Sequence, residues 1–422
     1  MKMTKYKLSE LVEVTRGASL SGQFYAEEGK LIRLTLGNFN MNGGGFKENT
    51  SKTDLYFTGT VRDEFILNEG DIITPLTEQS LGLLGTTARI PESGKYIQSQ
   101  DVALVRCKKG LLDPNFCYYL ISSSIVRQQL SAAAQQTKIR HTSPEKIKDC
   151  TVWVPDFDVQ KNIGRILTDI DNKIAINRQI NDNLEAMAKQ LYDYWFVQFD
   201  FPNEEGKPYK SSGGAMVWND KLKREIPSCF EVVNMGKLCD FRNGINYSKD
   251  ETGNDYQIVN VRNISSSRIL LDGEDFDVIT VPTSKAENYV LKPDDIIIAR
   301  SGCPGSTRLL LSSANTLFCG FIICCSPNDS SMRNYLVYCL KQLEGTNATT
   351  SGGSILQNVS QDTLKGLHVI VPKKQIIDKF NKTIELIFAR MLNCLKESKA
   401  LTKQRDELLP LLMNGQASVN SD

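Results

Sequence analysis

The chain has 422 residues, and its 50 lysines and arginines against 49 aspartates and glutamates leave a formal net charge of only +1. This length exceeds what one hydrophobic core usually supports, so two or three domains are expected. The balanced charge excludes a protein that is basic over its whole surface, as dedicated nucleic-acid binders often are. If DNA is the ligand, the positive charge must be local, or a partner must supply much of the backbone contact.

The N-terminus and the cysteines predict a cytoplasmic protein. No N-terminal stretch has the shape of a signal peptide, and the most apolar segment, 318–325, is far too short to span a bilayer. The 11 cysteines include no CxxC pair and are interpreted as reduced thiols, with Cys324 and Cys325 as small core residues. The only histidines are His141 and His368, so neither a zinc site nor a histidine-based catalytic site is expected.

The two halves of the chain resemble each other. Matched segments occur in the same order, and the loops between them differ in length. They are 11–17 with 238–244, 34–38 with 259–263, 65–73 with 289–297, and 143–155 with 360–372. Several weak matches in one order are stronger than any single match, so the sequence predicts an internal duplication.

A long helix is predicted at the end of each half. In the second half the polar residues Ser398 and Arg405 interrupt an apolar 4-3 spacing formed by Phe380, Ile384, Ile387, Met391, Cys394, Leu401 and Leu408. In the first half a seam begins with Ile163, Leu167, Ile170 and Ile174, and after a one-residue slip it continues with Ile180, Leu184, Met187 and Leu191. Helices of roughly 35–40 residues are about 55–60 Å long at 1.5 Å per residue. This length favours antiparallel coiled-coil pairing over the alternative of separate burial.

The predicted fold class is α+β, with two globular α/β heads that arose by internal duplication and two long, antiparallel, coiled-coil-like helices between them. Short β-branched runs and turn signals in each head support this class. The predicted boundaries are a first head at 1–157, a central helix at 158–200, a connector at 201–228, a second head at 229–374, a C-terminal helix at 375–415 and a tail at 416–422.

The central segment Leu191-Tyr-Asp-Tyr-Trp-Phe-Val-Gln-Phe-Asp-Phe-Pro202, with 206–214 and 216–218 after it, resembles the stretch between the two heads of type I restriction-modification specificity subunits. The segments 403–415 and 113–120 also resemble that family, and the resemblance covers nearly the whole chain. One feature departs from the pattern: the Pro-x-x-x-Gln that often follows Val-Pro in the family is matched only loosely here.

The resemblance implies a division of labour. Each head would be a target-recognition domain that reads one half of a bipartite, asymmetric site in double-stranded DNA. The helices would set the spacer between the half-sites and dock two methyltransferase subunits, which modify adenine using S-adenosylmethionine. Restriction and translocase subunits would then join. The chain itself would be a non-catalytic subunit of this DNA methylation and restriction complex, with no cofactor of its own and no membrane association.

The two candidate catalytic motifs in the sequence are better explained as structural features. The segment Asp113-Pro-Asn-Phe116 is one residue short of the adenine-methyltransferase loop, and it is better explained as a helix start with Asp113 as N-cap and Pro114 in the first turn. Asp294 and Asp295 adjoin a strand start and are interpreted as a solvated turn instead of nuclease carboxylates. A self-contained methyltransferase or nuclease is therefore disfavoured, and an assembly scaffold that binds no DNA remains the other alternative.

Loops after corresponding strands are the expected DNA contacts, because base edges and phosphates favour polar and basic side chains. In the first head the candidates are Arg16, Ser19, Thr77, Gln79, Gln136, Lys138 and Arg140. In the second head they are Arg242, Asn246, Arg300, Ser301, Ser354 and Gln357. The aromatic residues Trp195, Phe196 and Phe199 could stack on bases, but packing is the preferred interpretation. The loops of the two heads differ, which predicts two different half-sites.

Overall fold

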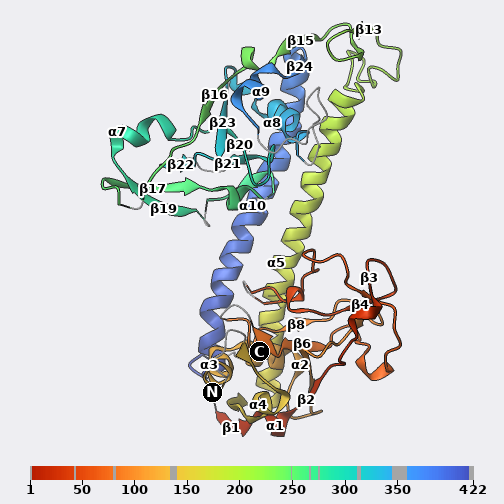
Figure 1. Ribbon diagram of the computed structural model, residues 1–422, viewed down its shortest axis with the longest axis vertical. Helices are drawn as coiled ribbons and strands as arrows, with labels where there is room; N and C mark the ends of the chain where they lie inside the picture. The colour runs from red at the N-terminus through yellow and green to blue at the C-terminus, as the bar shows by residue number, and fades with distance from the viewer. Residues whose placement is uncertain are drawn as a thin grey trace. The chain divides into compact units, whose positions relative to one another are not determined.

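The computed structural model describes residues 2–41, 44–78, 82–133, 140–248, 250–265, 268–273, 276–310, 315–344 and 359–417. The chain forms two compact units (Figure 1). Unit 1 comprises Met1–Ala175 and Lys399–Asp422, and unit 2 comprises Ile176–Ser398. Each unit therefore contains a mixed α/β region and a share of both long helices, which confirms the predicted fold class.

Unit 1 is built on a four-stranded antiparallel sheet in the order β2-β10-β6-β8. A second four-stranded sheet has the order β3-β5-β4-β9, and β1-β12 and β11-β7 form two-stranded ladders. The elements are β1 Met3–Lys7, α1 Leu8–Leu11, β2 Val12–Arg16, β3 Tyr25–Ala26, β4 Leu31–Arg33, β5 Tyr56–Phe57, β6 Ile72–Pro75, β7 Thr77–Glu78, β8 Ala88–Arg89, β9 Tyr96–Ile97, β10 Val102–Cys107, α2 Pro114–Ser122, α3 Ser124–Ala133, β11 Arg140–His141, α4 Pro144–Asp149 and β12 Thr151–Pro155.

Unit 2 is built on a five-stranded sheet in the order β16-β23-β20-β21-β18, beside a three-stranded sheet β19-β17-β22 and the ladders β13-β14 and β15-β24. The elements are β13 Met216–Asn219, β14 Arg224–Pro227, β15 Glu231–Asn234, β16 Cys239–Asn243, β17 Asn254–Val259, α6 Val261–Ser265, β18 Leu270–Leu271, β19 Asp277–Val281, α7 Thr283–Ala286, β20 Ile296–Ala299, β21 Thr307–Leu310, β22 Thr316–Phe318, β23 Ile322–Pro327, α8 Arg333–Lys341, α9 Gln361–Gly366 and β24 His368–Val371.

The two units repeat one topology. The order β2-β10-β6-β8 in unit 1 corresponds to β16-β23-β20-β21 in unit 2. The short helices α4 and α9 both begin at a serine N-cap: the Ser143 Oγ accepts the Lys146 N–H at 3.3 Å, and the Ser360 Oγ accepts the Thr363 N–H at 3.0 Å. This agreement in strand order and helix caps confirms the predicted internal duplication.

The aromatic residues of the central motif belong to the core of unit 2. Trp195, Phe196 and Phe199 are buried. The Phe196 ring meets the rings of Tyr335 and Phe380 edge-on, with centroids 4.8 and 5.0 Å apart. Edge-to-face pairs of this kind stabilise a core beyond the area they bury. The packing interpretation of these residues is therefore confirmed, and they are not available to stack on bases.

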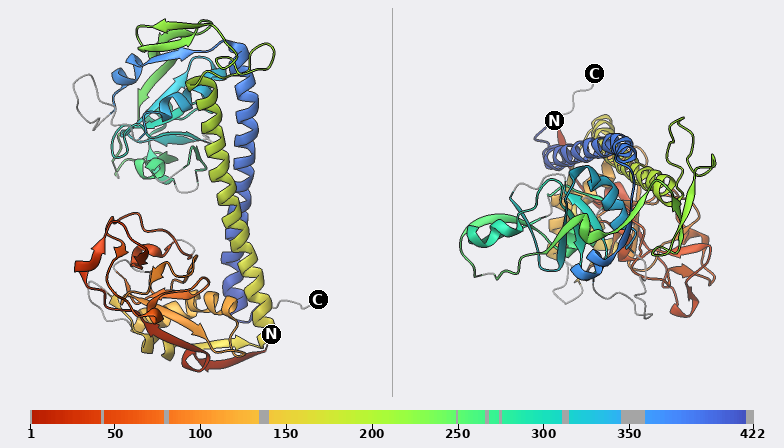
Figure 2. Two further views of the ribbon diagram at one scale, coloured as in Figure 1. Left: turned by 90° about the vertical axis from the view of Figure 1, so that its right-hand side faces the viewer. Right: turned by 90° about the horizontal axis from the view of Figure 1, so that it is seen from above.

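The two long helices are α5, Phe157–Tyr192, and α10, Lys374–Met413. Within each unit they run side by side and antiparallel (Figure 1 and Figure 2). In unit 2 the antiparallel direction follows from two contacts: Asn177 of α5 meets Glu397 of α10, and Tyr192 of α5 meets Phe380 of α10. No helix in the described ranges is long and apolar enough to cross a membrane.

The seam of α5 differs from the prediction. The predicted slip to Ile180 and Met187 is wrong, because Met187 is 54 % exposed and the seam continues on its original 4-3 spacing through Asn177 and Ala188, which are buried. The Asn177 Nδ2 donates a hydrogen bond to the Glu397 Oε2 at 2.8 Å. A polar side chain can occupy a buried seam position when it has a partner, and Glu397 is that partner for Asn177.

Arg405, one of the two polar residues in the seam of α10, has a carboxylate partner on α5. The Arg405 guanidinium lies 2.8 Å from the Asp171 Oδ1 on α5, and its side chain is only 11 % exposed. The other carboxylate oxygen of Asp171 accepts the Tyr119 hydroxyl of α2 at 2.6 Å. Arg405 therefore ties the end of α10 to α5 and α2 within unit 1.

Replacing Arg405 with alanine is expected to destabilise unit 1 by about 2 kcal/mol, because it leaves the Asp171 carboxylate partly buried without its cation. The measurement is the free energy of urea unfolding followed by circular dichroism. The control is Lys403→Ala, which removes an exposed cation 3.9 Å from Glu407 and should cost less than about 0.5 kcal/mol. Equal losses in the two variants would contradict a structural role for Arg405.

Candidate nucleic-acid interface

The first predicted loop of each unit begins at a glycine that the fold requires. A Cβ on Gly17 would lie 2.2 Å from the Gln98 carbonyl oxygen, and a Cβ on Gly244 would lie 2.1 Å from the Cys319 carbonyl oxygen. No side chain fits at such distances, so only glycine lets the backbone of the following turn pass there. The two glycines fix the same turn in both units, and the turns carry Ser19 and Asn246, which are both exposed.

The second predicted loop is fixed by equivalent backbone hydrogen bonds. The Thr142 N–H donates to the Leu76 carbonyl at 2.8 Å, and the Val359 N–H donates to the Arg300 carbonyl at 2.9 Å. Leu76 and Arg300 therefore occupy the same place in the two units. The Leu76 side chain is fully buried, whereas that of Arg300 is exposed. One backbone frame thus presents an apolar core residue in unit 1 and a cation in unit 2.

In unit 2 these loops meet at one end of the five-stranded sheet. The Arg300 N–H donates to the carbonyl of Phe321 at 2.8 Å, and the Asn246 side chain lies directly over Gly320 in the same turn. Phe321 is 63 % exposed, and Tyr247 is also exposed. Neither aromatic residue is among the predicted contacts, and Phe321 lies within the apolar run 318–325, where the pattern is that of a core strand. The available signal was an aromatic residue in the Cys-Gly-Phe turn between two apolar strands.

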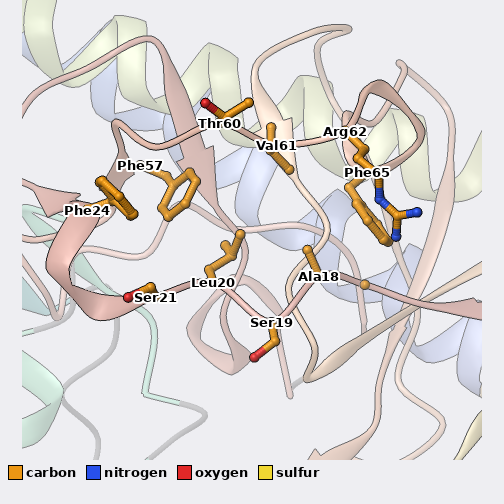
Figure 3. A pocket seen from close by; sticks show the side chains of 11 residues that line it. Ala18, Ser19, Leu20, Ser21, Phe24, Phe57, Thr60, Val61, Arg62 and Phe65 are labelled. Atoms are coloured by element: carbon orange, nitrogen blue, oxygen red, sulfur yellow. The ribbon is translucent and has the colours of Figure 1, made fainter.

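In unit 1 a pocket of about 450 Å³ opens beside Ser19 (Figure 3). The Arg62 guanidinium stacks over the Phe65 ring at 4.7 Å. The apolar side chains of the wall are those of Ala18, Leu20, Phe24, Phe57, Val61 and Phe65. Ser19 therefore lies beside a surface that combines apolar contact area with one cation.

Arg140 is held by a buried carboxylate. Its guanidinium lies 3.1 Å from the Glu78 Oε1, and the Glu78 side chain is only 2 % exposed. The other oxygen, Oε2, accepts the backbone N–H groups of Gly82, Leu83 and Leu84 at 2.9–3.1 Å. Charge-assisted bonds of this kind are strong. Arg140 therefore neutralises the carboxylate that holds the backbone of residues 82–84.

Arg242 on β16 is also held by a buried carboxylate, although it stands at a different place in its unit. Its guanidinium lies 2.6 Å from the Asp295 Oδ2 and donates to the Val290 carbonyl at 3.0 Å. Asp295 is buried and also accepts the Ser326 hydroxyl, so the prediction of a solvated turn is wrong for this residue. Burial of the neighbouring Cys324 raises the pKa of its thiol to about 12. That thiol is neutral at physiological pH, as the predicted core residue should be.

The predicted contacts fall into three groups. Five of them, Gln79, Gln136, Lys138, Ser354 and Gln357, lie outside the described residues. Thr77, Arg140, Arg242 and Ser301 are described and are buried or half-buried. The exposed ones are Arg16, Ser19, Asn246 and Arg300.

The segment Asp113-Pro-Asn-Phe116, which resembles a methyltransferase loop, is the start of a helix. Asp113 is the N-cap, since its carboxylate accepts the N–H groups of Asn115 and Phe116 at 3.0 Å.

The two units thus define a duplicated α/β protein whose halves present loops on one backbone frame. The model of the type I restriction modification DNA specificity domain matches this chain twice, at residues 1–186 and 227–405. The chain therefore belongs to the family of type I restriction-modification specificity subunits.

Individual relatives agree with this assignment. The MjaIX specificity subunit of Methanocaldococcus jannaschii is 25 % identical over 323 residues, which cover 74 % of this chain and 71 % of the relative. The HindI specificity subunit of Haemophilus influenzae is 22 % identical over 380 residues, covering 76 % and 81 %. The crystal structure of the S subunit from M. genitalium shares the fold, with a TM-score of 0.58 at 17 % identity, and covers 98 % of this chain and 96 % of that one.

Arg140→Ala is expected to destabilise unit 1 by about 2–3 kcal/mol, because the buried Glu78 carboxylate loses its cation. The measurement is thermal and urea unfolding of the purified chain. The matched control is His141→Ala at the adjacent, exposed position of β11, which should leave stability within about 0.5 kcal/mol. If Arg140→Ala weakens DNA binding and leaves stability unchanged, the side chain contacts DNA and does not position the loop.

Proposed function

We propose that the chain is the non-catalytic DNA-reading subunit of its complex, and that each unit reads one half of a bipartite, asymmetric site. The observation that carries this proposal is that the two units share one backbone frame and place different side chains on it, so their exposed groups differ. Ser19 stands where unit 2 has Asn246, and Leu76 stands where unit 2 has Arg300. Direct readout depends on side-chain hydrogen-bonding groups, so two such surfaces read two different sequences.

The exposed residues are the proposed DNA contacts. Arg300 has the chemistry for a bidentate bond to guanine or for a phosphate, and Asn246 has that for adenine. Phe321 offers apolar surface for a thymine methyl group. Arg16 and Ser19 are the corresponding contacts of unit 1. The remaining candidates stay proposals: Thr77, Gln79, Gln136, Lys138, Ser301, Ser354 and Gln357.

Arg140 and Arg242 take a different proposed role. Their guanidinium groups are engaged by Glu78 and Asp295, so they act as positioning residues that hold the reading loops in place. A direct contact between Arg140 and DNA is the alternative that the Arg140→Ala experiment tests.

The proposed assembly contains two methyltransferase subunits docked along the helices, with restriction and translocase subunits joining in the cytoplasm. S-adenosylmethionine belongs to the methyltransferase in this proposal, and the chain binds no cofactor. The target-recognition domains are proposed at 1–157 and 229–374, and the spacer helices at 158–200 and 375–415. The uninterrupted helical backbones of α5 and α10 support their use as spacers.

Arg300→Ala is expected to lower the DNA affinity of the methyltransferase complex about tenfold and to relax the sequence read in one half-site only. Affinity is measured by fluorescence anisotropy at several salt concentrations. The motif is measured by single-molecule sequencing of methyladenine in cells that carry the variant, the intact gene or a deletion. Lys237→Ala is the matched control, because this exposed cation precedes β16, at the end of that strand opposite the loops.

The two proposals for the chain predict different results. A DNA reader loses a split methylated motif when the gene is deleted, and Arg300→Ala degrades one half of that motif. An assembly scaffold predicts no DNA affinity even with methyltransferase present, and no change in sequence preference in the variant. Unchanged half-site preference in Arg300→Ala would remove Arg300 from the reading surface.

A further inference from the structure

A polar cleft lies in unit 2 at the start of α8, where that helix packs against α10. Its volume is about 670 Å³. It is separate from the loops described above, because its residues come from the turn before β20, the start of α8 and the first half of α10. The lining residues are Asp294, Ser330, Ser331, Arg333, Asn334, Asp378, Asn381, Lys382, Glu385 and Leu386.

The corresponding place in unit 1 is satisfied internally. There the Arg89 guanidinium of β8 donates to the Asn115 Oδ1 at 2.8 Å. In unit 2 the strand position of Arg89 is taken by Leu309: Ile72 pairs with Arg89, and Ile296 pairs with Leu309 in the same register.

Because unit 2 has no arginine at that strand position, the side-chain carbonyl of Asn334 has no such donor. Asn334 stands at the second position of α8, as Asn115 does in α2, and is only 5 % exposed. Its Oδ1 atom accepts no hydrogen bond from the described residues. An unpartnered buried carbonyl costs free energy, so this atom favours a donor that enters the cleft.

The packing of the long helix against the short one also differs between the units, and again it is closer in unit 1. A Cβ on Gly164 of α5 would lie 2.7 Å from both the Asn115 Cβ and the Phe116 nitrogen, so α5 packs directly against α2 in unit 1. At the equivalent place α10 carries Asn381, whose Nδ2 donates to the Ser331 carbonyl at 2.7 Å. The Asn381 Oδ1 is a second buried carbonyl with no donor among the described residues.

The charged side chains that line the cleft indicate the charge of its ligand. Three exposed carboxylates, Asp294, Asp378 and Glu385, line it together with two cations, Arg333 and Lys382. Of these carboxylates, Asp378 also lies 3.6 Å from the Lys374 Nζ. The lining has one carboxylate more than it has cations, and this excess together with the two unpartnered carbonyl oxygens disfavours a phosphate and favours a cationic donor.

Two further features favour a protein as the source of that cation. The Arg333 Nε–H is buried and donates to no acceptor in the described part of the chain, and a peptide carbonyl beside a basic side chain would satisfy it. Leu386 is 70 % exposed at the cleft and offers apolar contact to a neighbouring chain. A basic side chain on a folded protein supplies all three kinds of contact.

We propose that this cleft anchors one lysine or arginine side chain of a protein partner, and that the partner is the methyltransferase subunit bound at unit 2. The identity of the partner rests on the proposed function, whereas the cation chemistry does not. Because unit 1 fills the equivalent place with Arg89 and Gly164, it offers no such anchor. The two methyltransferase copies are therefore bound with unequal affinity, and the copy at unit 2 is bound more tightly.

The first experiment tests the cation site on the full chain without any partner. N-acetyl-arginine methylamide is compared with N-acetyl-citrulline methylamide, its neutral analogue, by saturation-transfer-difference NMR. The test variant Asp294→Asn/Asp378→Asn/Glu385→Gln neutralises the cleft. The control Glu225→Gln/Glu231→Gln/Asp240→Asn changes the net charge equally at three exposed positions of unit 2 outside the cleft.

The arginine probe should bind the wild-type chain and the control at least about fivefold more tightly than the citrulline probe, and this preference should vanish in the test variant. Equal binding of the two probes, or a preference that survives in the test variant, overturns the proposal. Displacement of the arginine probe by inorganic phosphate or by a DNA duplex also overturns it, because the site then recognises an anion.

The second experiment tests the partner. Titration of the purified methyltransferase subunit, followed by analytical ultracentrifugation, should give two binding steps, and only the tighter one should weaken, about tenfold, in the test variant. Equal weakening of both steps, or none, overturns the assignment of the partner. If the methyltransferase does not bind the wild-type chain at all, the proposed function fails, and the probe experiment still decides whether the cleft binds a cation.

Discussion

The proposed recognition surface of each unit depends on loops that are fixed by backbone atoms alone. Gly17 and Gly244 pass so close to a neighbouring carbonyl that no Cβ fits, and the carbonyls of Leu76 and Arg300 accept equivalent N–H groups from the segment before α4 or α9. Backbone hydrogen bonds do not constrain which side chain stands at each place. The frame therefore tolerates wide variation at its exposed positions while it keeps the position of each loop, which is the property a sequence reader needs.

The register of α5 against α10 depends on polar residues, because apolar seam residues alone would allow several alignments of the two helices. A polar residue in a seam is stable only opposite its partner, so Asn177 with Glu397 and Arg405 with Asp171 penalise any shifted alignment. Each unit contains one of these pairs. Register is thus specified within each unit separately, and the units need no further contact to fix it.

The sequence predicted the fold class, the duplication and the two helices, because these features depend on apolar periodicity and on order along the chain. It also predicted the Asp113 cap and the burial of Trp195 from local pattern. It failed where a polar residue is buried by a partner distant in sequence. Asn177 was excluded from the seam, and Asp295 was assigned to solvent, since neither Glu397 nor Arg242 is near in the sequence.

The candidate site shows the same limit. Residue type alone ranked Arg140 with Arg300, yet the Arg140 guanidinium meets a buried carboxylate, whereas the Arg300 side chain extends into solvent. Only tertiary structure separates an arginine that positions a loop from one that can reach a ligand. Phe321 was missed for the opposite reason, because an exposed aromatic residue in a tight turn has the same sequence signature as a core residue.

Duplication makes the remaining differences informative, because each unit serves as the reference for the other. Asn115 and Asn334 hold the same place, and the exchange of Arg89 for Leu309 removes the donor from one of them without removing the asparagine. A buried amide that has lost its donor would ordinarily be replaced by an apolar residue, since removing both partners is nearly neutral whereas removing one is costly. The retained Asn334, with Asn381 beside it, is consistent with a donor that comes from outside the chain.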